Sequence, residues 1–165
     1  MNDFYKAALK IQSAHNGFDP RSSGPQRTFQ QSELYPIFIV GAPRSGSTLL
    51  YQLLLKHARL TYISNLMSLV PNRMILIAKW TRYFNRFNKI KKSDLGYLPG
   101  LFSPSEAGAI QRMWFGEGSQ TESYPYIRNT IIWLTDIAGL PFINKNLLNS
   151  LRMIRIHKIL PEVKF

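Results

Sequence analysis

One stretch, residues 36–55 (PIFIVGAPRSGSTLLYQLLL), constrains the fold of this chain more than any other. It opens with an apolar run at 37–40, too short for a helix, whose lack of polar alternation is typical of a parallel strand buried on both faces. A loop of small and polar residues follows at 41–48, and a Leu-rich segment then predicts a helix over about 46–57. Strand, glycine loop and helix in this order predict an α/β fold with an anion-binding turn.

Apolar periodicity and turn residues extend this plan along the chain. The expected elements are, in order, a helix at 4–15, a linker at 16–33, a short strand at 61–64, a helical region at 67–88, a loop at 91–103, helices at 103–116 and 124–138, a strand at 140–143, a helix at 145–160 capped by Asn144, and a third strand beginning at 163. We therefore predict a parallel sheet flanked by helices. An N-terminal helix and linker would occupy 1–35, and one nucleotide-binding domain 36–165, with a helical insertion at about 66–139.

Composition narrows the classes of partner. The chain has 165 residues and a net charge of +12, from 21 Lys and Arg against 9 Asp and Glu, which favours anionic partners such as nucleotides or other polyanions. It has no cysteine, so no disulfide or thiolate metal site is expected. No secretory signal and no apolar run of about 20 residues is present, so we expect a cytoplasmic protein without a membrane span.

The loop itself has the spacing G-x-x-x-x-G-x-T. A P-loop for nucleoside triphosphates would carry lysine where Ser47 stands, and Arg44 is the cation available instead. Gly46 allows close approach of an anion, and the amides of 45–48 are expected to point at it from the positive end of a helix dipole. We predict a phosphate cradle that needs no metal and is formed by Pro43, Arg44, Ser45, Gly46, Ser47 and Thr48.

These residues carry a resemblance. IFIVGAPRSGSTLLYQLL resembles the 5′-phosphosulfate loop, P-R-S-G-[ST]-T, of the sulfotransferases that use 3′-phosphoadenosine 5′-phosphosulfate (PAPS). Residues 141–146 and 151–165 resemble the family segment leading to the 3′-phosphate-binding strand, and 62–65 is similar to the bacterial branch. The resemblance implies PAPS as the nucleotide cosubstrate and Lys145 as a further binding residue. The family's 3′-phosphate site would lie after Phe165, so we expect a truncated, N-terminal portion.

The resemblance also implies in-line transfer of a sulfuryl group to a hydroxyl or amine acceptor. Arg44 and Lys145 are the candidate cations for the charge that develops on the leaving phosphate. Protein-tyrosine sulfotransferases place a catalytic glutamate at the position of Asn65, and an amide cannot act as a base. The candidate bases in this chain are Glu106, Glu117, His57 and His157, and Glu106 is preferred because it lies in the insertion that shapes the acceptor pocket.

Simpler interpretations stay open. Glu106 stands three residues after Ser103 and before an expected helix, as the last member of a capping box does. Lys145, expected at a helix start, opposes the dipole and suggests a bound anion, but it also fits a solvated lysine. For the whole chain, the alternatives are a nucleotide kinase-like enzyme, against which the absent lysine counts, and a basic module that binds nucleic acid or another polyanion. The acceptor and the oligomeric state are not predicted.

Overall fold

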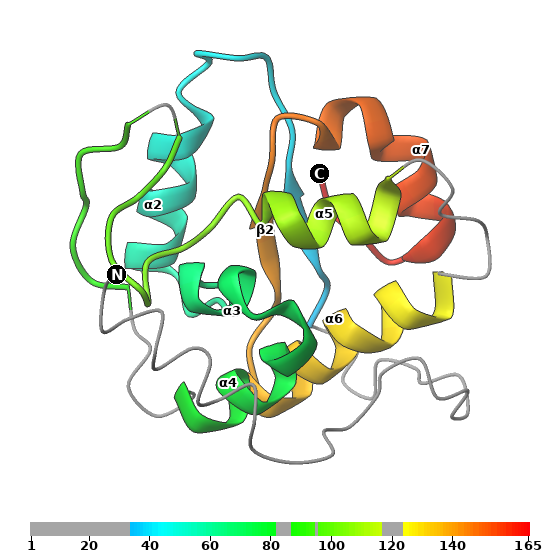
Figure 1. Cartoon of the computed structure of the whole chain (residues 1–165). Coiled ribbons are helices and arrows are strands. Elements are labelled where there is room, and N and C mark those ends of the chain that lie inside the picture. The colour runs from blue at the N-terminus through cyan, green and yellow to red at the C-terminus, as the bar shows by residue number, and fades with distance from the viewer. Residues whose placement is uncertain (1–33, 82–86, 95, 117–123) are drawn as a thin grey trace.

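Two short parallel strands lie at the centre of the computed structural model, which describes residues 34–81, 87–94, 96–116 and 124–165 (Figure 1). Strand β1 (Ile37–Ile39) pairs with β2 (Ile143–Lys145), with Ile37 opposite Ile143 and Ile39 opposite Lys145. Single parallel bridges extend the sheet on both sides, from Thr61 to Phe142 and from Ile37 to Lys164. Across the sheet the order is therefore Thr61, β2, β1 and Lys164. All neighbouring pairs are parallel, as in a parallel α/β sheet.

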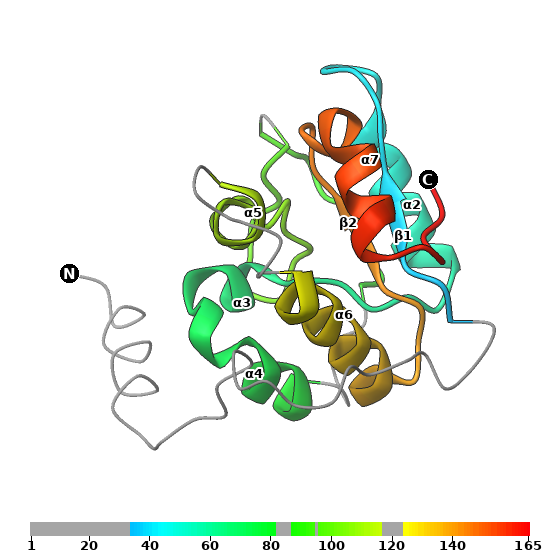
Figure 2. The same ribbon diagram turned by 90° about the vertical axis from the view of Figure 1, so that its right-hand side faces the viewer.

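Helices flank this sheet, and the mixed α/β fold predicted from the sequence is confirmed. They are α2 (Ser47–His57), α3 (Asn65–Leu69), a 3-10 turn (Pro71–Arg73), α4 (Met74–Thr81), α5 (Gly108–Phe115), α6 (Tyr124–Ala138) and α7 (Asn149–Ile159). In Figure 1, α2 and α7 lie on opposite sides of the sheet. Figure 2, turned by 90°, shows α3, α4 and α5 together beside β2 and away from β1.

Phe38 and Ile39, at the centre of the apolar run before the loop, are buried because both faces of β1 are covered. Phe38 belongs to a core cluster with Phe142 and side chains of α4, α5 and α6, and the two phenyl rings lie 6.0 Å apart. Ile39 points to the other face and packs in a second cluster with Tyr51 and Leu55 of α2. Alternate residues of a strand face opposite sides, so an all-apolar strand needs two such layers.

Several predicted boundaries are wrong where backbone pairing replaces a local pattern. The expected helix at 103 begins at Gly108 instead, because residues 103–105 pair with 63–65. The Asn65 amide donates to the Ser103 carbonyl at 2.9 Å, and the Ser105 amide donates to the Ile63 carbonyl at 2.9 Å. Ser103 therefore caps no helix, and the strand expected at 61–64 is reduced to isolated bridges at its two ends.

Two further boundaries move for related reasons. The helical region expected at 67–88 is divided, since Val70 precedes a proline and leaves the α region at φ −130° and ψ 68°. The second strand lies at 143–145, later than the expected 140–143, so Asn144 lies within β2 and caps no helix. The helix over 124–138 and its end at Gly139 are confirmed.

Some expectations fall outside the part of the chain that the structure describes. These are the helix at 4–15, the linker at 16–33 and residues 82–86 of the long helical region. Among the described helices, none is long and apolar enough to cross a membrane.

Candidate active site

The loop between β1 and α2 adopts a strained, solvent-facing turn. Arg44 has φ 63° and Gly46 has φ 79°, and residues 42–46 are exposed. A left-handed φ is unfavourable for a residue with a Cβ atom, and such strain is typical of functional loops. The Ser45 amide donates to the Ala42 carbonyl at 3.2 Å, so it is used within the loop and does not point at a ligand as predicted.

The first turn of α2 leaves its amides available. The first helical bond runs from the Leu50 amide to the Gly46 carbonyl at 3.0 Å, and among the described residues no backbone acceptor is recorded for the amides of 47–49. A Cβ atom built on Gly46 meets nothing within 4 Å. Free amides, an open approach and the hydroxyls of Ser47 and Thr48 form a cradle that suits an anion.

Helix α7 fixes the start of the loop. The Gly41 amide donates to Ser150 Oγ at 2.9 Å, and Ser150 Oγ donates to the Gly41 carbonyl at 3.3 Å. The neighbouring Asn149 side chain donates to the Ile39 carbonyl at 3.2 Å. These two residues hold the carboxyl end of β1, and neither was predicted from the sequence because more than 100 positions separate them from the loop.

Lys145 lies beside this loop. It is the last residue of β2, opposite Ile39 and two positions before the level of Gly41, so the premise that it starts a helix is wrong. Its side chain is only 3% exposed, and its ammonium forms an ion pair with Glu106. A buried ammonium needs such a partner because removal from water disfavours the charged form.

Glu106 reaches Lys145 because its backbone is held outside a helix. The following residue, Ala107, is buried with φ 55°, and the Asn146 side chain donates to the Glu106 carbonyl at 2.9 Å. Gly96 packs against the Glu106 carboxylate, where an added Cβ atom would overlap it. The capping-box interpretation is therefore wrong, and Glu106 and Lys145, two of the predicted site residues, lie in direct contact.

Two buried tyrosines pack against β2, the strand that ends at Lys145. Tyr51 of α2 and Tyr62 pack in one cluster with Ile143, two residues before Lys145. Burial raises the pKa of the Tyr51 phenol well above its usual value, and Tyr62 and Glu106 raise it further. Burial also raises the pKa of Tyr62, whose hydroxyl donates to the Phe102 carbonyl at 2.9 Å. Neither tyrosine was predicted; the signal for Tyr51 was its place one helical turn after Ser47.

Comparison with known protein families identifies the family of this chain. The model of the family described as the sulfotransferase family matches residues 36–165, which include the loop, Glu106 and Lys145. The chain belongs to the sulfotransferase family. The family resemblance stated from the sequence is thereby confirmed. A search of curated proteins and a search of solved structures gave no significant match.

The structure separates the two histidine candidates of this sulfotransferase from the loop. His57 is exposed at the far end of α2, about 15 Å along the helix from the loop at 1.5 Å per residue. His157 is exposed near the carboxyl end of α7, whereas the loop contacts the amino end of that helix through Ser150. Glu117 lies outside the described residues. Glu106 is thus the one candidate base that the described structure brings beside Lys145.

Asn65 has a different part in this chain from that of the family glutamate. Its buried side-chain amide donates to the carbonyls of Leu98 and Gly100, at 2.7 and 2.8 Å. Those bonds hold the loop that carries Gly96 against Glu106. Asn65 therefore supports the segment around Glu106.

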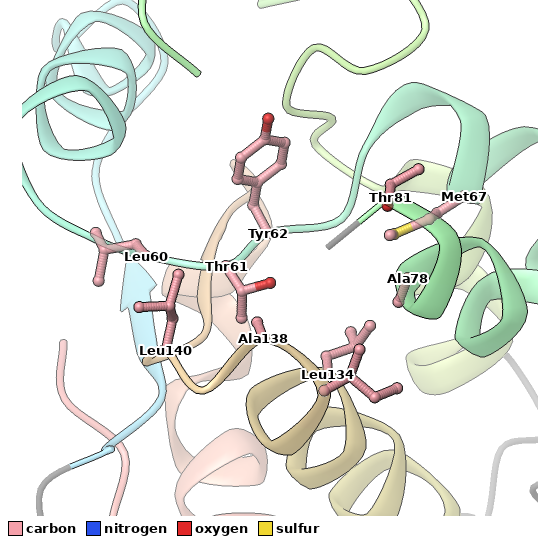
Figure 3. A pocket seen from close by; sticks show the side chains of 10 residues that line it. Leu60, Thr61, Tyr62, Met67, Ala78, Thr81, Leu134, Ala138 and Leu140 are labelled. Carbon is pink, nitrogen blue, oxygen red and sulfur yellow. The ribbon is translucent and has the colours of Figure 1, made fainter. Parts of the chain in front are cut away.

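A small cavity in this sulfotransferase lies away from the candidate site. Figure 3 shows side chains of α4, α6 and the 60–62 segment around it, with the Tyr62 hydroxyl directed away from the centre. Its lining is mostly apolar: Leu60, Thr61, Tyr62, Met67, Ala78, Thr81, Leu134, Ile137, Ala138 and Leu140. Leu140 and Thr61 adjoin the amino-terminal side of β2, so the cavity lies at the opposite end of that strand from Lys145.

Proposed function

We propose that this sulfotransferase binds PAPS through the loop at 41–48 and transfers its sulfuryl group to a hydroxyl or amine acceptor. The observation that carries the proposal is the position of Lys145. It is buried at the carboxyl end of β2, paired in register with Ile39 just before the loop, and in contact with one carboxylate, Glu106. A cation and a carboxylate next to a phosphate cradle are what sulfuryl transfer requires of a protein.

The residues present fit the phosphosulfate end of PAPS. The amides of 47–49 and the hydroxyls of Ser47 and Thr48 offer hydrogen-bond donors, and Gly46 leaves the approach open. Arg44 is exposed in the same loop and can add its charge. The missing P-loop lysine favours an anion other than a magnesium-bound triphosphate. When bound, PAPS supplies the activated sulfuryl group.

Different side chains of the protein would then have separate roles in the transfer. Glu106 would take the proton from the acceptor as the new oxygen–sulfur or nitrogen–sulfur bond forms. Lys145 and Arg44 would stabilise the negative charge left on the departing phosphate as its bond to sulfur breaks. Because Lys145 is paired with Glu106 and stands in register with Ile39, just before the loop, one side chain would serve both partners.

The proposal is tested by calorimetric titration with adenosine 3′,5′-bisphosphate, with ATP in the presence and absence of Mg²⁺, and with single-stranded DNA. We expect the bisphosphate to bind with an affinity that does not depend on Mg²⁺. In a second assay with sulfur-labelled PAPS, we expect transfer of the label to acceptors from a panel of phenols, sugars and amines. Preference for ATP with Mg²⁺ would instead indicate a kinase-like enzyme. Salt-dependent DNA binding without a response to the bisphosphate would indicate a polyanion-binding module.

A further inference from the structure

The Tyr51 hydroxyl is a buried polar group that the described structure leaves without a hydrogen bond. Tyr51 is 1% exposed, and no described residue partners its oxygen. An unsatisfied buried hydroxyl costs about 1–3 kcal/mol, and such groups in folded proteins call for an explanation. The neighbouring Tyr62 differs, since its hydroxyl has the Phe102 carbonyl as acceptor.

Tyr51 lies on the face of α2 that packs against β2, the strand that ends at Lys145. Ser47 and Tyr51 are four residues apart in α2, and both are buried, so they share the inner face of the helix. Tyr51 packs against Ile143, and Ile143 and Lys145 project from the same face of β2. Burial raises the pKa of the Tyr51 phenol most, and the nearby Tyr62 and Glu106 raise it further.

Glu106 has an oxygen to spare. Its Oε1 atom accepts from Lys145, and no described residue donates to Oε2. If Lys145 turns to the leaving phosphate during the reaction, the carboxylate loses the one group that orients it. A carboxylate that acts as a base must keep its direction, since proton transfer requires hydrogen-bond geometry.

We propose that Tyr51 is a positioning residue: when Lys145 turns to the leaving phosphate, the Tyr51 hydroxyl, which has no partner in the described structure, donates a hydrogen bond to the Glu106 carboxylate and holds it toward the acceptor. The proposal rests on the function proposed above, in which Glu106 is the base. It assigns the unpartnered donor of α2 to the unpartnered acceptor beside Lys145. It also explains why a phenol, and no apolar side chain, occupies this buried helix position.

The test compares Tyr51→Phe with Tyr62→Phe, which removes the same group from a hydroxyl that already has a partner. For Tyr51→Phe we expect kcat to fall about tenfold with little change in the KM for PAPS. Loss of a donor to a carboxylate favours its protonated form, so the acid limb of kcat against pH should move to higher pH. Tyr62→Phe should leave that limb in place. A Tyr51→Phe profile that superimposes on the wild-type profile would overturn the proposal.

A second measurement separates this inference from the proposed function. The carboxyl ¹³C signal of Glu106 is followed through a pH titration of the bisphosphate complex, in wild type and in Tyr51→Phe. A shifted titration with no sulfuryl transfer would support the role of Tyr51 and reject the proposed reaction. Transfer activity with identical titrations would do the reverse. Tyr51→Phe removes no hydrogen bond seen in the structure, so it should unfold at the same urea concentration as wild type.

Discussion

Lys145 and Glu106 form an ion pair although they are 39 positions apart in the chain. One stands at the end of a core strand and the other in an irregular segment before α5. The ion pair therefore links β2 to the irregular segment before α5. The two side chains differ in exposure, 3% for Lys145 and 26% for Glu106. Removing one charge should therefore change the free energy of unfolding by a different amount from removing the other.

Replacing each member of the pair tests that difference. Glu106→Gln leaves a buried ammonium without a counter-charge and should lower the free energy of unfolding by about 2 kcal/mol. Lys145→Met leaves a carboxylate that water can reach, and it should cost less. The double variant should be more stable than the sum predicts, with a coupling of about 1 kcal/mol in urea denaturation. Strict additivity would show that the pair contributes nothing.

Arg44→Ala should weaken binding of adenosine 3′,5′-bisphosphate about tenfold or more, because a charged donor to phosphate is removed. Alanine keeps a Cβ atom at the same left-handed φ of 63°, so backbone strain is unchanged and the side chain alone is tested. Arg59→Ala, an exposed arginine just past the far end of α2, is the control by calorimetry. Equal affinity in both variants would remove Arg44 from the site.

Two glycines allow strain and binding to be separated. Gly46 and Gly139 have φ 79° and 62°, and a Cβ atom on either meets nothing within 4 Å. Alanine at each should therefore destabilise the fold by a similar amount, about 1 kcal/mol. Only Gly46→Ala should reduce bisphosphate affinity, since its methyl group would enter the cradle. Equal affinity for the two variants would place the ligand elsewhere.

Asn65→Ala should lower the free energy of unfolding by about 2 kcal/mol, because the buried Leu98 carbonyl and the part-buried Gly100 carbonyl lose their donor. Asn65→Glu, which introduces the residue of related enzymes, should destabilise further, since a carboxylate would face those carbonyls. Asn72→Ala, in the exposed part of the 3-10 turn, is the control. An Asn65→Glu protein as stable as wild type would contradict this account.

Alkaline pH should destabilise the fold through the two buried tyrosines. The pKa of each is raised in the folded state, so their contribution to stability is complete below the unfolded value near pH 10. It is lost as pH rises through the folded values, because the unfolded chain ionises first. Stability measured by urea at pH 9 and pH 11 should fall less for Tyr51→Phe than for wild type. An equal fall would mean that Tyr51 ionises freely in the fold.

The loop could be predicted from the sequence because its signals are local. An apolar run, two glycines and a Leu-rich segment lie within 20 residues, and β1, the turn and α2 follow them. The segment before α5 could not be predicted in this way. Ser103 and Glu106 match a local capping pattern, but pairing of 103–105 with 63–65 supplies better-satisfied backbone bonds.

The same limit explains the shift of β2 and the missed residues. The strand boundary depends on register with β1, which no local pattern near 140–145 encodes. Tyr51 reads as an ordinary core residue, and its meaning depends on a carboxylate that arrives from 55 positions away. Ser150 likewise has no motif of its own. These features could not be predicted because they depend on partners far away in the sequence, and not because the local patterns are weak.

The hydrogen bond between Gly41 and Ser150 closes a span of 109 positions. The entrance of the loop therefore reaches its final geometry only after α7 has docked, and the ligand site should mature late in folding. Ligand binding at the loop would in turn hold both ends of that span together. Amide exchange of α7 should then slow when adenosine 3′,5′-bisphosphate binds.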